Sequence, residues 1–264
     1  MKITIITTKS AAILAGTATM VAGMILTTPA RAAGNGTDIL HFSLIKTTMN
    51  NGVETGADGV VVASQEKQGK ADNQKLNIAV TGLTNNATYE LVAAIDSDTN
   101  LTDITEFTTD DKGKALLEYR SQDNGHRGGK GTSALPASLN PVSLIREVDI
   151  VNSSTQTVLT ADLTMPDKLN YLIKRNLSTN AIKAELRIEA TTSHTRFDLM
   201  SSGLAPGGSY LLVFNGNVVQ TNTSSANGRL DIKTSSQTPP YVLDLRTVEL
   251  WDSSSNVVLQ TALP

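Results

Sequence analysis

The chain has 264 residues, no cysteine, few aromatic side chains and a formal net charge of −3 at neutral pH. A slightly acidic chain lacks the excess of Lys and Arg with which proteins neutralise nucleic-acid phosphates or anionic membranes. Nucleic acid is therefore excluded as an expected partner. The absence of cysteine excludes disulfides, thiolate metal sites and a thiol nucleophile, so we expect a hydrophobic core alone to stabilise the fold.

The first 32 residues have the features of a signal peptide. Lys2 and Lys9 accompany an apolar run at 11–26, and Ala30-Arg31-Ala32 forms a small-x-small cleavage pattern. The run of about 16 residues is shorter than the roughly 20 that a membrane-spanning helix needs. We expect cleavage near Ala32, which lowers the formal charge from −3 to −6 by removing Lys2, Lys9 and Arg31. The mature chain is then secreted or periplasmic, with no integral membrane segment.

The mature chain contains two diverged copies of one module. Residues 246–259 match 146–159 at an offset of 100, residues 203–212 match 82–91 at an offset of 121, and residues 226–229 match 111–114 at an offset of 115. Each copy opens on a similar strand, at 40–42 and at 169–171. We expect the first module at 37–164 and the second at 168–264. The short link between them contains Pro166 and should restrict their arrangement.

The shift in offset from 121 to 115 places six extra residues in the first module, around Asp96-Ser-Asp98-Thr-Asn100. Alternating side-chain oxygens of this kind are typical of calcium loops. The sequence departs from the helix-loop-helix calcium motif, because Leu101 and Phe107 stand where Gly and Glu are required. Asp96, Asp98 and Asn100 therefore predict a looser calcium site, and a polar turn between strands is the alternative.

The first module also carries fifteen extra residues at 121–135, because the offset falls from 115 to 100. Four glycines make this insertion flexible, and His126, Arg127 and Lys130 make it locally basic. Loops added to a rigid sandwich frequently carry function. These three side chains are predicted to form a binding loop, and a tolerated excursion without function is the alternative.

The second module shows the strand pattern most clearly. Apolar and polar residues alternate at 184–189, 196–199 and 230–233, and residues 210–214 are continuously apolar. The pattern at 242–250 predicts a strand with an irregularity near Arg246-Thr247, and 257–263 closes the module. Asn215-Gly216 and Asn227-Gly228 predict type I′ hairpins. We therefore expect an all-β fold, with two tandem antiparallel β-sandwiches of about seven or eight strands each.

Two stretches carry a resemblance to a family. They are Gly-Leu-x-Pro-Gly-Gly-x-Tyr-x-Leu-Val-x-x-Gly at 203–216 and Leu-Pro-Ala-Ser-Leu-Asn-Pro-Val at 135–142. Both look like duplicated, immunoglobulin-like β-sandwich repeat domains of uncharacterised secreted bacterial proteins. The resemblance covers most of the mature chain. It implies a β-sandwich fold, and it brings no catalytic residues.

The residues themselves predict no catalytic site and no cofactor besides calcium. His41, His126 and His194 fall in a strand, a loop and a turn without metal-ligand spacing, and no Ser lies in a Gly-x-Ser-x-Gly elbow. We expect a noncatalytic structural, adhesive or ligand-binding protein, whose partner is an unknown protein or glycan. The alternative is a carbohydrate-active accessory protein or weak hydrolase of surface polysaccharide, which would use an aromatic groove. The chain has a single tryptophan, Trp251, to contribute to one.

Overall fold

The computed structural model of the chain describes residues 38–96, 101–121, 132–236 and 241–263. Within these ranges the chain forms three β-sheets, with short 3-10 turns between some of the strands. Strand pairing is antiparallel except at one short edge strand. The expected all-β sandwich architecture is therefore confirmed.

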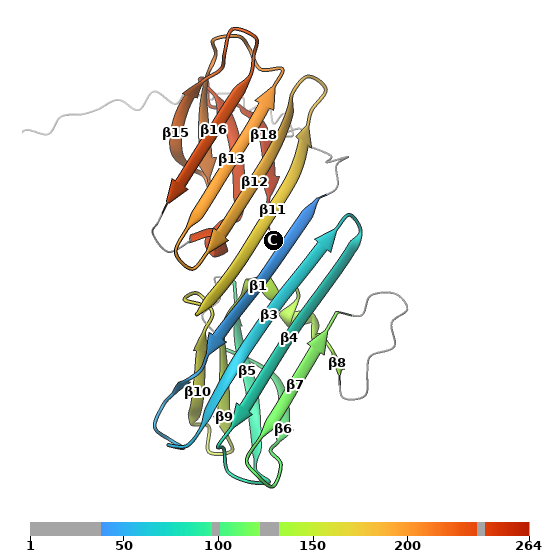
Figure 1. Cartoon of the computed structure of the whole chain (residues 1–264), viewed down its shortest axis with the longest axis vertical. Helices are drawn as coiled ribbons and strands as arrows, with labels where there is room; N and C mark the ends of the chain where they lie inside the picture. Colours follow the sequence, from blue (N-terminus) through green and yellow to red (C-terminus); the bar gives the residue numbers. More distant parts are fainter. Residues whose placement is uncertain (1–37, 97–100, 122–131, 237–240, 264) are drawn as a thin grey trace, which may run out of the picture.

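One large sheet runs through the whole molecule (Figure 1). Its nine strands, from one edge to the other, are β16 (Leu230–Ser236), β13 (Thr195–Ser202), β12 (Lys183–Thr191), β11 (Lys168–Ser178), β1 (Ile39–Thr47), β3 (Asp58–Gln68), β4 (Ala71–Thr81), β7 (Ala115–Arg120) and β8 (Ser133–Ala134). We call the face that points away from the two smaller sheets its outer face.

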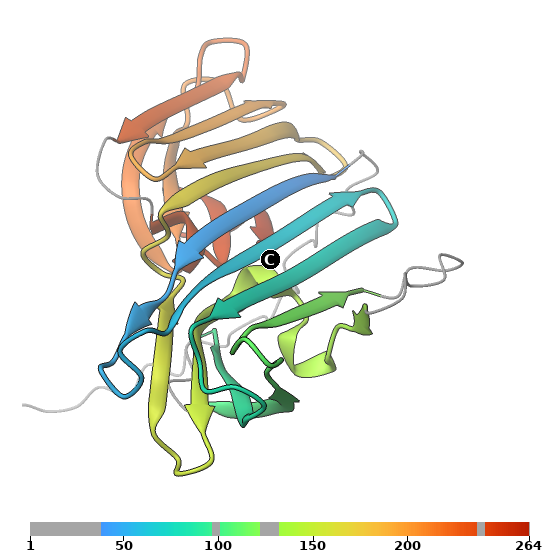
Figure 2. The same cartoon turned by 60° about the horizontal axis from the view of Figure 1, so that its bottom comes forward.

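A smaller sheet packs behind each half of the large one (Figure 2). Behind the first half lie β2 (Met49–Asn50), β10 (Thr157–Asp162), β9 (Ile145–Asn152), β5 (Thr88–Ile95) and β6 (Thr102–Thr108). Behind the second half lie β15 (Asn217–Thr223), β14 (Ser209–Phe214), β17 (Thr247–Asp252) and β18 (Val257–Ala262). The 3-10 turns are η1 (Ala137–Leu139), η2 (Val142–Leu144) and η3 (Tyr241–Asp244). We call β1–β10 the first module and β11–β18 the second.

The strand registers repeat between the modules. In the first module Thr47 faces Val60, which faces Ala79 on the next strand; in the second, Asn176, Glu185 and Met200 face one another in the same order. Counterparts on these three strand pairs are thus 129, 125 and 121 residues apart. Strands β7 and β16, which pair with β4 and β13, have counterpart residues 115 positions apart. Strands β9 and β10 have their counterparts on β17 and β18, 100 positions further along the chain. Paired positions on these strands therefore have defined counterparts in the second module, except at the turn between β3 and β4, where both strands are longer than β12 and β13.

The two modules join by direct pairing of their opening strands, β1 and β11. Phe42 faces Tyr171 across this seam, and these two residues are counterparts, 129 positions apart. Their rings meet edge to face, with centroids 6.4 Å apart at an angle of 82°. A local twofold axis consequently passes between them. Alternate side chains along both strands point inward, so the modules share one continuous apolar cluster.

Two turn dipeptides have different outcomes. Asn215 and Gly216 both have positive φ, of 49° and 77°, and join paired strands at Phe214 and Asn217, as predicted for a type I′ hairpin. The hairpin predicted at Asn227-Gly228 is wrong, because β15 and β16 lie in different sheets. Gly228 has the expected positive φ, but it turns the chain from one layer to the other.

The strand predicted at 242–250 is also partly wrong. Its first residues form the 3-10 turn η3, and β17 begins at Thr247. Val242 and Leu243 of this turn and Leu245 just after it are buried and belong to the apolar cluster. The spacing of these apolar residues predicts a strand, but a 3-10 turn can bury residues at the same spacing. The register shift in this region lies at Leu250/Trp251 rather than near Arg246-Thr247.

Candidate functional site

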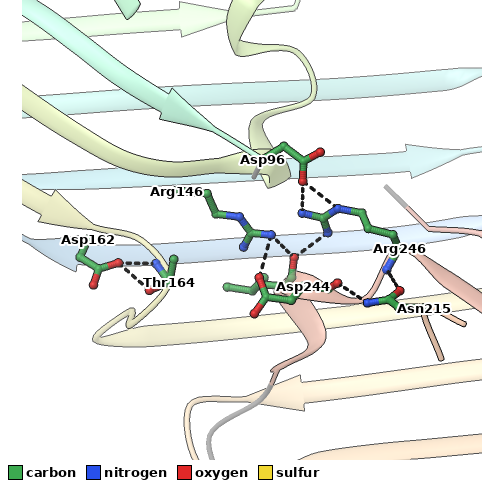
Figure 3. Close-up of polar contacts among 8 residues, drawn as sticks. Asp96, Arg146, Asp162, Thr164, Asn215, Asp244 and Arg246 are labelled. Atoms are coloured by element: carbon green, nitrogen blue, oxygen red, sulfur yellow. Dashed lines mark hydrogen bonds and ion pairs between the residues drawn. The ribbon is translucent and has the colours of Figure 1, made fainter. Parts of the chain in front are cut away.

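Most of the residues predicted to form sites lie outside the described part of the chain. These are Asp98 and Asn100 of the calcium prediction and His126, Arg127 and Lys130 of the inserted loop. Asp96 is described. It has a positive φ of 56°, and its Oδ1 accepts hydrogen bonds from Nε and Nη2 of Arg246 at 3.0 and 2.7 Å (Figure 3). Asp96 thus links the two modules, and calcium binding at this loop stays a prediction.

Two counterpart arginines meet at the junction between the modules (Figure 3). Arg146 and Arg246 are 100 positions apart, and both donate to the carbonyl oxygen of Leu243, at 2.5 and 2.6 Å. Arg146 also forms an ion pair with Asp244 at 3.0 Å. Burial and the charge of Arg246 lower the pKa of Arg146, while Asp244 and Asp96 raise it. The two cations are balanced by two carboxylates and a carbonyl, so we interpret this cluster as a structural clamp.

The two described histidines do not come together. His41 is exposed on the outer face of the nine-stranded sheet, and His194 lies in the turn between β12 and β13. Within the described ranges, no three His, Asp or Glu side chains are grouped so that they could hold a metal ion.

An apolar patch lies on the outer face of the large sheet, in the first module. It consists of Ile45, Val60, Val62, Ala79 and Leu116, which we call the apolar patch. Ile45 faces Val62, Val60 faces Ala79, and Ala79 faces Leu116, so the five side chains are contiguous. Leu116 is 62% exposed, and the other four are half-buried among their neighbours.

The same positions of the second module are mostly charged. Around them Arg196 and Asp198 form an ion pair at 2.9 Å, and Lys233 and Asp231 form one at 2.8 Å. This fold therefore forms without apolar residues at these positions, so core packing does not explain the patch. The counterparts, in the order given above, are Lys174, Glu185, Arg187, Met200 and Asp231.

A second difference lies on the outer face of the five-stranded sheet, which is acidic. None of its acidic side chains forms an ion pair with a Lys or Arg of the described residues. The corresponding face of the second module keeps one acidic residue, Glu249. The six acidic residues are Glu90, Asp103, Glu106, Glu147, Asp149 and Asp162. Their counterparts are Leu211, Val218, Thr221, Thr247, Glu249 and Ala262.

The acidic face is electrostatically unfavourable in the ionised state. Burial raises the pKa of Asp149. Burial, followed by the charges of Asp149 and Asp162, raises the pKa of Glu147. Desolvation, followed by the charge of Asp103 and a hydrogen bond to it, raises the pKa of Glu90. A bound cation would relieve the repulsion among these groups.

Known proteins offer no guide to either surface, since no family model, curated protein or solved structure matches the chain. None of the described helical turns has the length and apolar character needed to cross a membrane. The sequence alone predicts neither surface, because each combines residues of several strands whose pairing has to be known. Placing Ile45, Val60 and Val62 against Lys174, Glu185 and Arg187 at the right offsets would have revealed the contrast.

Proposed function

We propose that the protein is a noncatalytic, extracytoplasmic structural or adhesive protein that works through the apolar patch of its first module. The observation that carries this proposal is the contrast between the patch and its charged counterparts in the second module. The second module folds with charged residues at these positions, so folding does not require the apolar patch. An exposed apolar cluster that folding does not require usually binds a partner.

The partner proposed is a second copy of the same chain. A flat sheet face buries apolar side chains best against another flat sheet face. Two identical patches can meet about a twofold axis, so that each side chain finds an apolar neighbour. The modules already meet about a local twofold axis at Phe42 and Tyr171, although through strand edges rather than faces. A patch of five side chains is small, so we expect weak association, with a Kd on the order of 0.1 mM.

Sedimentation velocity over a range from about 5 to about 500 μM tests this function. The wild-type sedimentation coefficient is expected to rise with concentration. The variant Val60→Glu/Val62→Arg/Leu116→Asp, which takes the residues of the second module, is expected to stay monomeric. Each substitution introduces the residue that stands at the counterpart position of the second module. Because the second module folds with these residues, the variant should fold as well.

The matched control is Val218→Asp, because Val218 is 53% exposed on β15, away from the patch. It should self-associate like the wild type. A wild-type chain that stays monomeric over the whole range would contradict the proposed partner. Unchanged association of the triple variant would contradict the proposed surface.

A further inference from the structure

The acidic face of the first module has Asp149 at its centre. Asp149 lies on β9, where it faces Val92 of β5 and Thr160 of β10. Glu147 lies two residues away on the same strand, and therefore points to the same face. Asp162 faces Glu147 from β10, and its side chain joins the same row. Three carboxylates thus come from neighbouring positions of two paired strands.

Asp149 is unusual because it is buried without adequate partners. It is only 4% exposed, and its Oδ1 has no hydrogen-bond partner. The Thr160 hydroxyl donates to the carboxylate, and it accepts in turn from Asn51 at 3.0 Å. Burying an ionised carboxylate without a compensating charge is costly. The Thr160 hydroxyl alone does not offset that cost.

In the second module, hydrogen-bond donors of the protein itself stabilise the carboxylate at the position that corresponds to Asp149. The counterpart of Asp149 is Glu249, which accepts from Trp251 Nε1 at 2.6 Å and from Gln260 Nε2 at 3.1 Å. In the first module Trp251 is replaced by Val151 and Gln260 by Thr160. The indole and amide donors are therefore lost, while Glu147 and Asp162 add negative charge.

The geometry points to a calcium site at Asp149, with Glu147 and Asp162 as further ligands. Carboxylate and hydroxyl oxygens without His or Cys suit a hard divalent cation, and Ca²⁺ accepts irregular sets of oxygen and water ligands. Asp162 Oδ1 accepts from the N–H and hydroxyl of Thr164, at 2.9 and 2.6 Å, which leaves its second oxygen for the ion. Glu147 and Asp162 have to rotate toward Asp149, because no three acidic side chains of the described residues are yet grouped for a metal.

This site uses other residues than the calcium site predicted from the sequence at Asp96, Asp98 and Asn100, so substitutions can distinguish the two. We would measure the thermal melting of the full chain, with calorimetric titration, in CaCl₂, in MgCl₂ and in KCl of matched ionic strength. Calcium is expected to raise the melting temperature of the wild type, with a Kd of about 0.1–1 mM, as in extracellular calcium modules. Asp149→Asn is expected to weaken calcium binding at least tenfold, roughly the loss seen on disturbing metal-site residues.

Asp149→Asn should fold, since it removes a poorly compensated charge. Glu147→Gln is a second variant that should also lose calcium affinity, should Asp149→Asn prove unstable. Glu249→Gln and Asp98→Asn are the controls, and both should keep the calcium response. The proposal is overturned when calcium gives no heat and no shift in the wild type, or when the response survives both Asp149→Asn and Glu147→Gln. Loss of the response in Asp98→Asn alone would assign calcium to the loop instead.

Discussion

Phe42→Ala is expected to lower the free energy of unfolding by about 3–5 kcal/mol, the range measured for removal of a buried aromatic ring. Phe42 is 3% exposed and packs edge to face on Tyr171 across the seam. The substitution leaves a cavity where the two modules join, so both modules should lose stability together. A single cooperative transition at lower denaturant concentration is the expected result.

The position of the tryptophan makes this prediction easy to check. Trp251 is the sole tryptophan and lies in the second module, whereas Phe42 lies in the first. Urea unfolding followed by tryptophan fluorescence and by far-UV circular dichroism should give the same lowered midpoint. A fluorescence midpoint that stays at the wild-type value would show that the modules unfold independently. Val53→Ala, at an exposed position of the first module, is the control and should change stability by less than about 0.5 kcal/mol.

Gly82→Ala should be the second most damaging substitution, costing about 3 kcal/mol or more in unfolding free energy. Gly82 has a φ of +71°, and an added Cβ would lie 1.9 Å from the carbonyl oxygen of Gly56. Its counterpart Gly203 has the same problem, with a Cβ 2.1 Å from the carbonyl oxygen of Ala181. Both glycines allow two loops to approach closely at the end of each sandwich.

Gly216→Ala shows how much of the loss in Gly82→Ala comes from backbone strain and how much from the steric contact with Gly56. Gly216 has a φ of +77°, but nothing lies within 4 Å of an added Cβ, so this variant should lose only about 1–2 kcal/mol from backbone strain. Chemical denaturation of both variants gives the comparison. Equal losses for Gly82→Ala and Gly216→Ala would show that the contact with Gly56 is not rigid.

The local features of the fold were the more predictable ones. Alternation marked strands such as β12 and β13, and the offsets between the two copies recur in the strand registers. Asn215-Gly216 formed its hairpin because it lies between strands that pair. Asn227-Gly228 did not, because a turn dipeptide specifies backbone angles and not the sheet that the chain enters next.

The contacts between modules could not be predicted in this way. Pairing of β1 with β11 joins residues about 130 positions apart, and nothing in either strand alone specifies the other as its neighbour. The apolar patch likewise combines residues from four strands, none of which looks unusual by itself. Asp149 is not distinctive in the sequence, because it stands out only by its burial and by the lack of the hydrogen-bond donors that Glu249 has.

We propose that the protein binds its partner through the apolar patch, and cysteine labelling tests this proposal most directly. The chain has no cysteine, so Leu116→Cys and its counterpart Asp231→Cys each introduce a sole thiol at an exposed position. The rate of maleimide labelling would be measured from dilute to concentrated protein. We predict that the rate at position 116 falls as concentration rises, while the rate at position 231 stays constant. A rate at position 116 that does not depend on concentration, or an equal fall at both positions, would contradict association through the apolar patch.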